Sequence, residues 1–248
     1  MKKVFFILMV VGMVIAMSSC EKEEVKPLMS IKNNEISIHH DGTEKLIVEN
    51  AEGDITYSSE NKLIADVSDD GIVTGRVKGS TKITVTAGGE SATCKVEVKT
   101  LINFIPEPYQ GFGEGYETVK NKIKDDGELI ENDGSLGVMK TIDGTKFIYV
   151  YVFEGGKLES SGFVFSTLSK TLSSMTDFLL ERYVPVTQTG TYSYAFISPD
   201  KKTAVYIKLS DDLELVHVIY FPYTETKLAS AVYSIPENCK EMVKGLLH

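Results

Sequence analysis

Residues 69–86 read DDGIVTGRVKGSTKITVT, and this stretch decides the fold of the first part of the chain. Branched apolar residues alternate with polar ones in two short runs, 72–74 and 81–86, as they do in half-buried strands. Gly71 and Gly79 precede the runs, where a tight turn requires the positive φ that glycine adopts without strain. The stretch therefore predicts antiparallel strands joined by tight turns.

The same alternation continues on both sides, from residue 28 to residue 99. Turn-forming pairs at Asp41-Gly42 and Gly88-Gly89 separate the runs, which is the pattern of β-hairpins. No part of the region has a helical period. These observations predict an all-β sandwich of about 70 residues that buries the inward face of each strand. The other strand-like runs are 35–38, 45–48, 55–57, 64–67 and 93–98.

Five motifs of this region stand in a fixed order: YSSEN at 57–61, ADV at 65–67, DGIVTG at 70–75, GSTKITV at 79–85 and ATCKV at 92–96. This order resembles the bacterial immunoglobulin-like domain of group 2. The resemblance implies an immunoglobulin-like sandwich, with Tyr57 where the family usually has Trp. Such domains occur in surface adhesins and as spacers that hold another domain off the cell envelope. The resemblance therefore implies a fold and no particular ligand.

The first 19 residues have the parts of a secretory signal peptide. Lys2 and Lys3 are followed by an apolar run over 4–16 and by small residues before Cys20. The apolar run is shorter than the ~20 residues that a transmembrane helix needs. The residues around Cys20 resemble the lipobox of bacterial lipoproteins, which implies a diacylglycerol anchor on the Cys20 thiol. The alternative is an ordinary secretory signal followed by a chance cysteine.

Glu21, Lys22, Glu23 and Glu24 follow Cys20 directly. An acidic cluster with a lysine at this place resembles the lipoprotein export signal of the Bacteroidota, which implies a lipoprotein exposed on the outside of the outer membrane. The alternative is that residues 20–27 are only a solvated tether, since a charged run buries too little apolar surface to become ordered. We therefore expect the outer membrane as one partner, reached through the lipid anchor.

The composition is that of a folded, secreted protein. Of the 248 residues, 42% are apolar and 25% are charged. The formal charge of −9 becomes about −11 once Lys2 and Lys3 are cleaved off. No cluster of Lys and Arg offsets this charge, which argues against nucleic acid as a partner. Two cysteines remain after Cys20, and the alternation around Cys94 favours a buried free thiol over a disulfide bond to Cys239.

The pattern changes after residues 100–114, whose prolines and glycines indicate a linker. One helix is expected over 115–125, and a second follows over 172–183 with Ser169 as its N-cap. Each helix precedes three strand-like runs with turn residues between them. The runs are 136–142, 146–153 and 157–165 after the first helix, and 191–197, 203–209 and 213–221 after the second.

The order of one helix and three strands therefore occurs twice, over 115–166 and 169–223. This possible tandem repeat predicts an α+β domain over 115–248, built from antiparallel sheets with helices packed on one face. In element order alone it resembles the fold of the β-lactamase-inhibitor proteins. A C-terminal amphipathic helix is expected after Ser234. The predicted fold class is thus multidomain, an all-β immunoglobulin-like sandwich over 28–99 followed by an α+β domain with two helix–antiparallel-sheet repeats.

No set of residues in the sequence indicates catalysis or metal binding. His39 and His40 are adjacent and would face opposite ways on a strand, while His217 lies within a strand and His248 is terminal. The glycines of 111–115 lack the Lys-Ser/Thr of a phosphate loop and suit a flexible hinge. We therefore expect no catalytic residue, no metal and no cofactor, and a protein that is not an enzyme.

Tyrosines concentrate in the strands of the second domain. On an exposed sheet they would give an amphipathic contact surface for a protein or glycan partner. The alternative, which we favour, is that they are strand-forming residues that fill the sheet. The candidate binding residues are Tyr149, Tyr151, Tyr192, Tyr194, Tyr206 and Tyr220.

The sequence as a whole predicts a cell-surface lipoprotein with a binding or adhesive role. The immunoglobulin-like domain would present the α+β domain as a head. Two alternatives stay open, a periplasmic assembly or inhibitor-type lipoprotein that binds another protein, and a polysaccharide hydrolase with a carboxylate pair. The hydrolase is the least favoured of the three.

Overall fold

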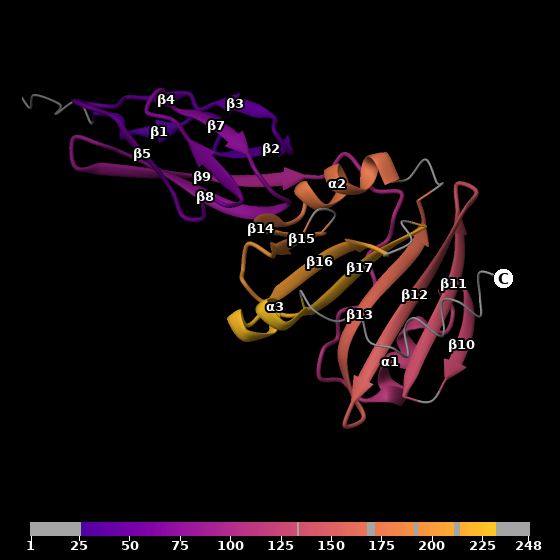
Figure 1. Cartoon of the computed structure of the whole chain (residues 1–248). Coiled ribbons are helices and arrows are strands. Elements are labelled where there is room, and N and C mark those ends of the chain that lie inside the picture. The colour runs from indigo at the N-terminus through magenta and orange to yellow at the C-terminus, as the bar shows by residue number, and fades with distance from the viewer. Residues whose placement is uncertain (1–25, 133, 168–171, 191–192, 211–213, 232–248) are drawn as a thin grey trace, which may run out of the picture.

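The computed structural model describes residues 26–132, 134–167, 172–190, 193–210 and 214–231. The predicted signal peptide, the lipidation site at Cys20 and the export signal at 21–24 lie outside these residues, as do Ser169, Tyr192 and everything after residue 231, including Cys239 and the helix expected after Ser234. The described strands form a small sandwich over 30–99 and one large sheet over 128–222, as Figure 1 shows. Each part has its own hydrophobic core.

The sandwich consists of two main sheets. One has the order β2 (Glu35–His39), β9 (Glu90–Lys99), β8 (Gly79–Ala87) and β5 (Thr56–Ser59), and the other has β3 (Thr43–Lys45), β7 (Ile72–Gly75) and β6 (Ala65–Val67). The short strands β1 (Ser30–Ile31) and β4 (Val48–Glu49) pair beside them. Strand β2 runs parallel to β9, and the other pairs are antiparallel. The strand runs predicted from alternation are thus present, with 45–48 interrupted between β3 and β4.

Alternate residues of the long strands fill the core of the sandwich. Val73, Ile83 and Val85 are fully buried, while their neighbours along the strand face outward. Cys94 is a buried free cysteine, as the alternation predicted, and its thiol donates a hydrogen bond to the Asn33 carbonyl oxygen at 3.2 Å. Burial raises the pKa of Cys94 to about 11. The thiol is therefore protonated at neutral pH and acts as a small apolar side chain.

The turn before β7 depends on Gly71. Its φ is 75°, and its amide donates a hydrogen bond to the Ser68 carbonyl oxygen at 2.9 Å. A Cβ at this position would lie 2.7 Å from the ring of Tyr57, which packs against the sandwich core. Glycine is required here both by the backbone conformation and by the aromatic ring.

We expect Gly71→Ala to destabilise the sandwich more than Gly53→Ala does. The two glycines have φ of 75° and 78°, so each substitution adds about 1–2 kcal/mol of left-handed strain. Only at position 71 would the new Cβ also overlap Tyr57, since nothing lies within 4 Å of the Cβ position at residue 53. Thermal unfolding of the two variants measures the difference, and equal losses would show that the ring moves aside freely.

The second part of the chain forms a single eight-stranded antiparallel sheet. Its two halves join where β13 pairs with β17, with Ser161 opposite Tyr220 and Phe165 opposite Val216. The outermost strands are therefore the first strand of each half. The spatial order is β10 (Glu128–Asn132), β11 (Ser135–Ile142), β12 (Thr145–Glu154), β13 (Lys157–Ser166), β17 (Leu215–Pro222), β16 (Thr203–Leu209), β15 (Ser193–Ile197) and β14 (Val184–Gly190).

The larger core lies on the sheet face that α1 (Tyr116–Ile123) and α2 (Leu172–Leu180) cover. Helix α1 buries Val119 and Ile123, which are four residues apart and therefore on one helical face. The sheet contributes a cluster of aromatic rings with centroids 5.3–6.4 Å apart. The rings are those of Phe147, Tyr149, Phe163 and Phe165.

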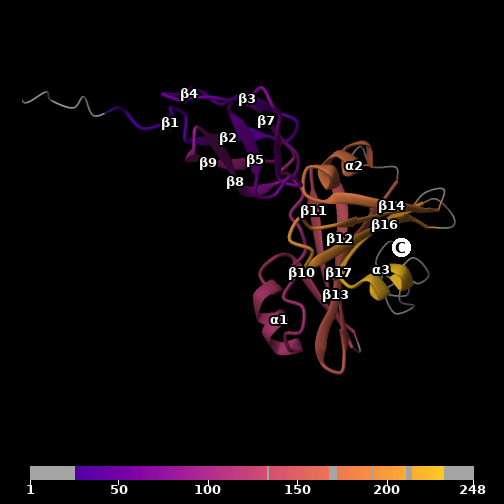
Figure 2. The same cartoon turned by 90° about the vertical axis from the view of Figure 1, so that its left-hand side faces the viewer.

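The opposite face of the sheet carries a smaller core. Here α3 (Glu225–Ala231) places Leu228 against a cluster that contains Tyr206 and Phe221. Figure 2 shows α1 and α3 on opposite sides of the sheet. The two helices expected from the sequence, α1 and α2, both pack against the larger core, whereas α3 was not expected and covers the opposite face, because both faces of the sheet are apolar and both need cover.

The structure also differs from the predicted element count. Two separate sheets were expected, and the described strands form one, with four strands in each half. The additional strands are β10 and β14, the two edges. Pro185 lies within β14, and an edge strand tolerates proline because its outward N–H groups need no partner. Strands account for most of the described chain, so the fold is predominantly β.

Candidate functional site

The tyrosines predicted to form a contact surface are mostly buried. Tyr149, Tyr151, Tyr206 and Tyr220 are each at most 3% exposed, whereas Tyr194 is 45% exposed. The prediction of an exposed tyrosine surface is therefore wrong for the four buried residues. They are strand-forming residues that fill the sheet, which is the alternative favoured from the sequence.

Several of these tyrosines instead hold residues 101–112, here called the strap, across the sheet. The Tyr149 hydroxyl donates a hydrogen bond to the Pro106 carbonyl oxygen at 2.8 Å. The Tyr151 hydroxyl accepts one from the Tyr109 amide at 3.4 Å, and burial raises the pKa of Tyr151 to about 12. Ile105 of the strap is 2% exposed and belongs to the larger core. The strap, which falls within the segment expected to be a linker, is thus packed against the head.

The strap and the sandwich meet at the end of α2, where Glu181 is buried. One carboxylate oxygen of Glu181 accepts hydrogen bonds from the amides of Leu101 and Ile102, both at 3.0 Å. Its backbone carbonyl accepts a hydrogen bond from the Lys78 amide of the sandwich at 2.7 Å. Val184, three residues on, packs against the sandwich core. Glu181 therefore joins α2, the strap and the sandwich at one point.

Arg182 completes this junction. Its guanidinium donates hydrogen bonds to the Ile102 carbonyl oxygen at 2.5 Å, and to the Phe178 carbonyl oxygen at 3.0 Å within the last turn of α2. It lies 3.4 Å from the Glu181 carboxylate and 3.7 Å from that of Glu107. The side chains of Glu181 and Arg182 are only 4% and 6% exposed. Backbone carbonyl oxygens and two nearby carboxylates offset the cost of burying this charge, and among the described residues the Arg182 Nε atom has no hydrogen-bond partner.

The next residue, Tyr183, extends the junction into the core of the head. Its hydroxyl donates a hydrogen bond to a Glu107 carboxylate oxygen at 2.5 Å and accepts one from the Gln110 side chain at 3.5 Å. Burial and the neighbouring Glu107 carboxylate raise the pKa of Tyr183 well above its usual range. The hydroxyl is therefore a permanent donor that fixes the middle of the strap.

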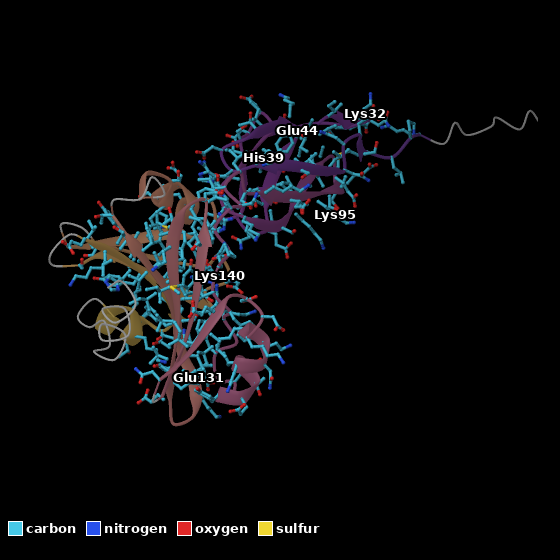
Figure 3. The ribbon with its side chains drawn as sticks, turned by 90° about the vertical axis from the view of Figure 1, so that its right-hand side faces the viewer. Lys32, His39, Glu44, Lys95, Glu131 and Lys140 are labelled. Atoms are coloured by element: carbon cyan, nitrogen blue, oxygen red, sulfur yellow. The ribbon has the colours of Figure 1, made fainter. Side chains whose placement is uncertain are left out.

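The histidines among the described residues form no cluster. His39 is exposed on the sandwich, where Figure 3 labels it, and the ring of His40 contacts the Arg76 carbonyl oxygen instead. His217 is buried in β17 of the head. Within the part of the chain that the structure describes, no three His, Cys, Asp or Glu side chains are grouped so that they could hold a metal ion.

A groove of about 810 Å³ lies on the head beside the β12–β13 hairpin. Four segments build it: residues 110–113, that hairpin, the turn between β15 and β16, and Pro222 at the end of β17. The hairpin lies at the end of the sheet away from the sandwich, as Figures 1 and 2 both show. The lining residues used below are Gln110, Phe112, Lys157, Leu158, Asp200 and Lys202.

The glycine-rich residues 111–115, which begin at the end of the strap, are fixed against the hairpin. The Gly113 amide donates to the Leu158 carbonyl oxygen, and the Leu158 amide donates to the Glu114 carbonyl oxygen, both at 2.8 Å. Gly115 also bridges to Lys157 in the manner of an antiparallel strand. The segment is therefore part of the groove wall, in contrast to the flexible hinge expected from its composition.

The charged form of Asp200, one of the acidic groups of the groove, is favoured by its hydrogen bonds. The Ser198 hydroxyl donates to Asp200 at 2.6 Å and, with the Lys202 amide, keeps the pKa of Asp200 below its usual value. Glu159 lies 2.5 Å from the Lys227 ammonium. A glycosidase needs a carboxyl group whose pKa is raised so that it can act as a general acid. Asp200 is shifted in the opposite direction.

Sequence patterns could not have located the junction or the groove. Glu181-Arg182-Tyr183 resembles the charged end of any helix, and its partners lie about 80 positions earlier in the chain. The groove comes mainly from three loops whose composition is that of ordinary turns. One feature of the sequence does indicate that the strap packs against a core. Its segment is otherwise typical of a linker but contains the apolar and aromatic residues Ile102, Phe104, Ile105 and Tyr109.

These observations define a two-part chain, a small β-sandwich joined through a buried junction to a large antiparallel sheet with a loop-built groove. Residues 26–96 match the family described as bacterial Ig-like domain (group 2). The sandwich is therefore a bacterial immunoglobulin-like domain, and the predicted resemblance is confirmed for this part. No curated protein matches the chain.

Several solved structures are similar to the chain at low identity and with low TM-scores. An intimin mutant of EHEC O157:H7 has 20% identity and a TM-score of 0.26, over 52% of this chain and 88% of that one. Domains 5–6 of the S-layer protein SbsC have 12% identity and a TM-score of 0.26, over 80% and 85%. Human protocadherin-24 EC1-2 has 7% identity and a TM-score of 0.26, over 78% and 93%. Similarity at this level carries no argument about function.

None of the helices in the described residues has the length and apolarity needed to cross a membrane.

Proposed function

We propose that this chain is a lipid-anchored cell-surface protein with a non-catalytic binding or adhesive role. The lipid on Cys20 would hold the chain in the outer membrane, with residues 21–24 directing it to the outside. The immunoglobulin-like domain is then a spacer, and the large sheet is the head that contacts a protein or glycan ligand. The observation that carries this proposal is the buried junction at Glu181.

The junction supports a spacer role because it couples the head to the sandwich. A spacer joined by a free linker would let the head rotate, as relative domain motion is usual where few contacts cross a boundary. Here the Lys78 amide of the sandwich donates a hydrogen bond to the Glu181 carbonyl oxygen, and Val184 packs against the sandwich core. The head is therefore held in one direction relative to its stalk, which suits a surface that presents a binding site.

We further propose that the head is an internal duplication of an α+β unit. One helix and four antiparallel strands form each half, α1 with β10–β13 and α2 with β14–β17. The last strands of the halves, β13 and β17, pair at the centre, so the first strands lie at the two edges. This arrangement is what two copies related by a twofold axis would give.

Protease treatment of intact cells tests the location. We expect external protease to remove the head from wild-type cells while a soluble periplasmic marker stays intact. Replacing residues 21–24 with four alanines should leave the protein lipidated at Cys20 but protected from protease. If the wild-type protein is itself protected until the outer membrane is opened, the surface proposal is wrong and the periplasmic alternative is supported.

An array screen tests the binding role. The mature chain with Cys20→Ala keeps every described residue and removes the lipid, so it can be applied in solution to immobilised neutral glycans, anionic glycans and peptides. Saturable binding to any of these classes is the expected result. If the chain binds none of these classes, the binding role is wrong and a purely structural role is supported.

A further inference from the structure

The groove beside the β12–β13 hairpin has balanced charge. Lys157 and Lys202 line it together with Glu154, Glu159 and Asp200. Lys202 lies 3.4 Å from the Asp200 carboxylate, and Lys227 lies 2.5 Å from Glu159. The opposite charges therefore neutralise one another locally, although the whole chain carries a formal charge of −9. A strongly charged ligand gains little from such a surface.

The groove also offers polar groups with fixed orientation. Asp200 is held by the Ser198 hydroxyl and the Lys202 amide, which leaves its second oxygen beside the Lys202 ammonium. Gln110 is oriented by the Thr203 hydroxyl at 3.3 Å and by Tyr183 at 3.5 Å. Groups that are already oriented lose little freedom when a ligand binds. They provide both donors and acceptors at the groove surface.

Apolar groups line the same groove. Leu158, 2% exposed, lies in its wall, and the half-buried ring of Phe112 and the ring of Pro222 lie with it. A ligand that presents hydroxyl groups on its edges and C–H groups on its faces matches a site of this composition, with the aromatic ring as a stacking platform. The volume of about 810 Å³ is large enough for several sugar residues.

A peptide is less well matched to the groove. Strand addition needs a free edge of backbone N–H and C=O groups. The Gly113 amide and the Leu158 amide, which face each other across the wall, are already bonded to the Leu158 and Glu114 carbonyl oxygens. The apolar groups line an open groove and form no deep pocket for an anchoring side chain.

From the charge balance, the oriented polar groups and the apolar wall, we infer that this groove binds an uncharged oligosaccharide. The inference rests on the proposed binding function and specifies its site and the chemistry of its ligand. The contact groups are the Asp200 carboxylate, the Lys202 ammonium, the Gln110 amide and the Phe112 ring. No bond is made or broken in this role, because the chain binds the sugar and releases it unchanged.

The test uses the mature chain with Cys20→Ala and titrates it with neutral hexasaccharides of glucose, mannose, galactose and xylose. Binding is measured by isothermal calorimetry. At least one hexasaccharide is expected to bind, and the Asp200→Asn/Lys202→Ala variant is expected to bind it about tenfold more weakly or worse. Lys82→Ala is the matched control, since Lys82 is an exposed lysine in a surface depression of the sandwich and should leave the affinity unchanged.

Two results would overturn the inference. In the first, no neutral hexasaccharide binds while an anionic glycan or a peptide does, in which case the binding function stands and the ligand chemistry is wrong. In the second, a neutral hexasaccharide binds equally well to the wild type and to the groove variant, in which case the site is wrong. Asp200 and Lys202 lie in an exposed turn, so the variant is expected to fold. Circular dichroism of the variant checks that weaker binding does not come from unfolding.

Discussion

Replacing Glu181 with alanine is expected to lower the free energy of unfolding by about 3–5 kcal/mol. The substitution removes the acceptor of the Leu101 and Ile102 amides and leaves the buried guanidinium of Arg182 without its nearest carboxylate. A buried group that loses its partner keeps its full desolvation penalty, so the loss exceeds that of an exposed ion pair. Urea denaturation followed by circular dichroism measures the change.

Glu128→Ala is the control for this substitution. Glu128 is an exposed glutamate on the edge strand β10, so its removal should change stability by less than about 0.5 kcal/mol. Small-angle scattering of folded Glu181→Ala provides a second readout, because loss of the junction should increase the radius of gyration. A variant that keeps both its stability and its compact shape would contradict the assigned role of Glu181, and with it the observation on which the spacer proposal depends.

The sandwich could be predicted from the sequence because its signals are local. The long strands alternate buried and exposed residues, as in Ile83 and Lys82, and glycines mark the turns between strands. A sheet that is solvated on its outer face leaves this alternation in the sequence. The positive φ of Gly71 and the overlap that any Cβ would have with Tyr57 explain why the turn requires that residue.

The head was harder to predict because its sheet is covered on both faces. In β12, Tyr149 and Tyr151 face one core while Ile148 and Val150, equally buried, face the other side. When both faces of a sheet are apolar and buried, the alternation of residues does not show which face is exposed, so the sequence leaves both an exposed tyrosine surface and a buried one open. The edge strands were missed for a related reason, since an edge such as Glu128–Asn132 is short and has little alternation.

The junction and the groove depend on contacts that are remote in sequence. Glu181 bonds to Leu101, 80 positions away, and Gln110 bonds to Thr203, 93 positions away. Such pairs follow from the tertiary fold and leave no spacing that a single sequence displays.

Replacing Phe163 with alanine is expected to destabilise the head by about 3–5 kcal/mol. Phe163 is 1% exposed on β13, next to the centre of the sheet. Its ring centroid lies 5.6 Å from that of Tyr149, 5.9 Å from that of Phe147 and 6.2 Å from that of Tyr220. The substitution leaves a cavity among rings that the two halves of the sheet hold apart, so the site cannot collapse to fill it.

Phe163→Leu is the control, because it keeps most of the apolar volume and should lose clearly less stability than the alanine variant.

The comparison also tests how far the two parts of the chain unfold together. The protein is labelled with 3-fluorotyrosine, and fluorine NMR then follows the signal of Tyr57 in the sandwich separately from the signals of the tyrosines in the head. If Phe163→Ala moves both sets of signals to the same lower denaturant concentration, the Glu181 junction couples the parts into one cooperative unit. If only the head signals move, the junction positions the domains without coupling their stability, and the loss from Glu181→Ala should fall on the head alone.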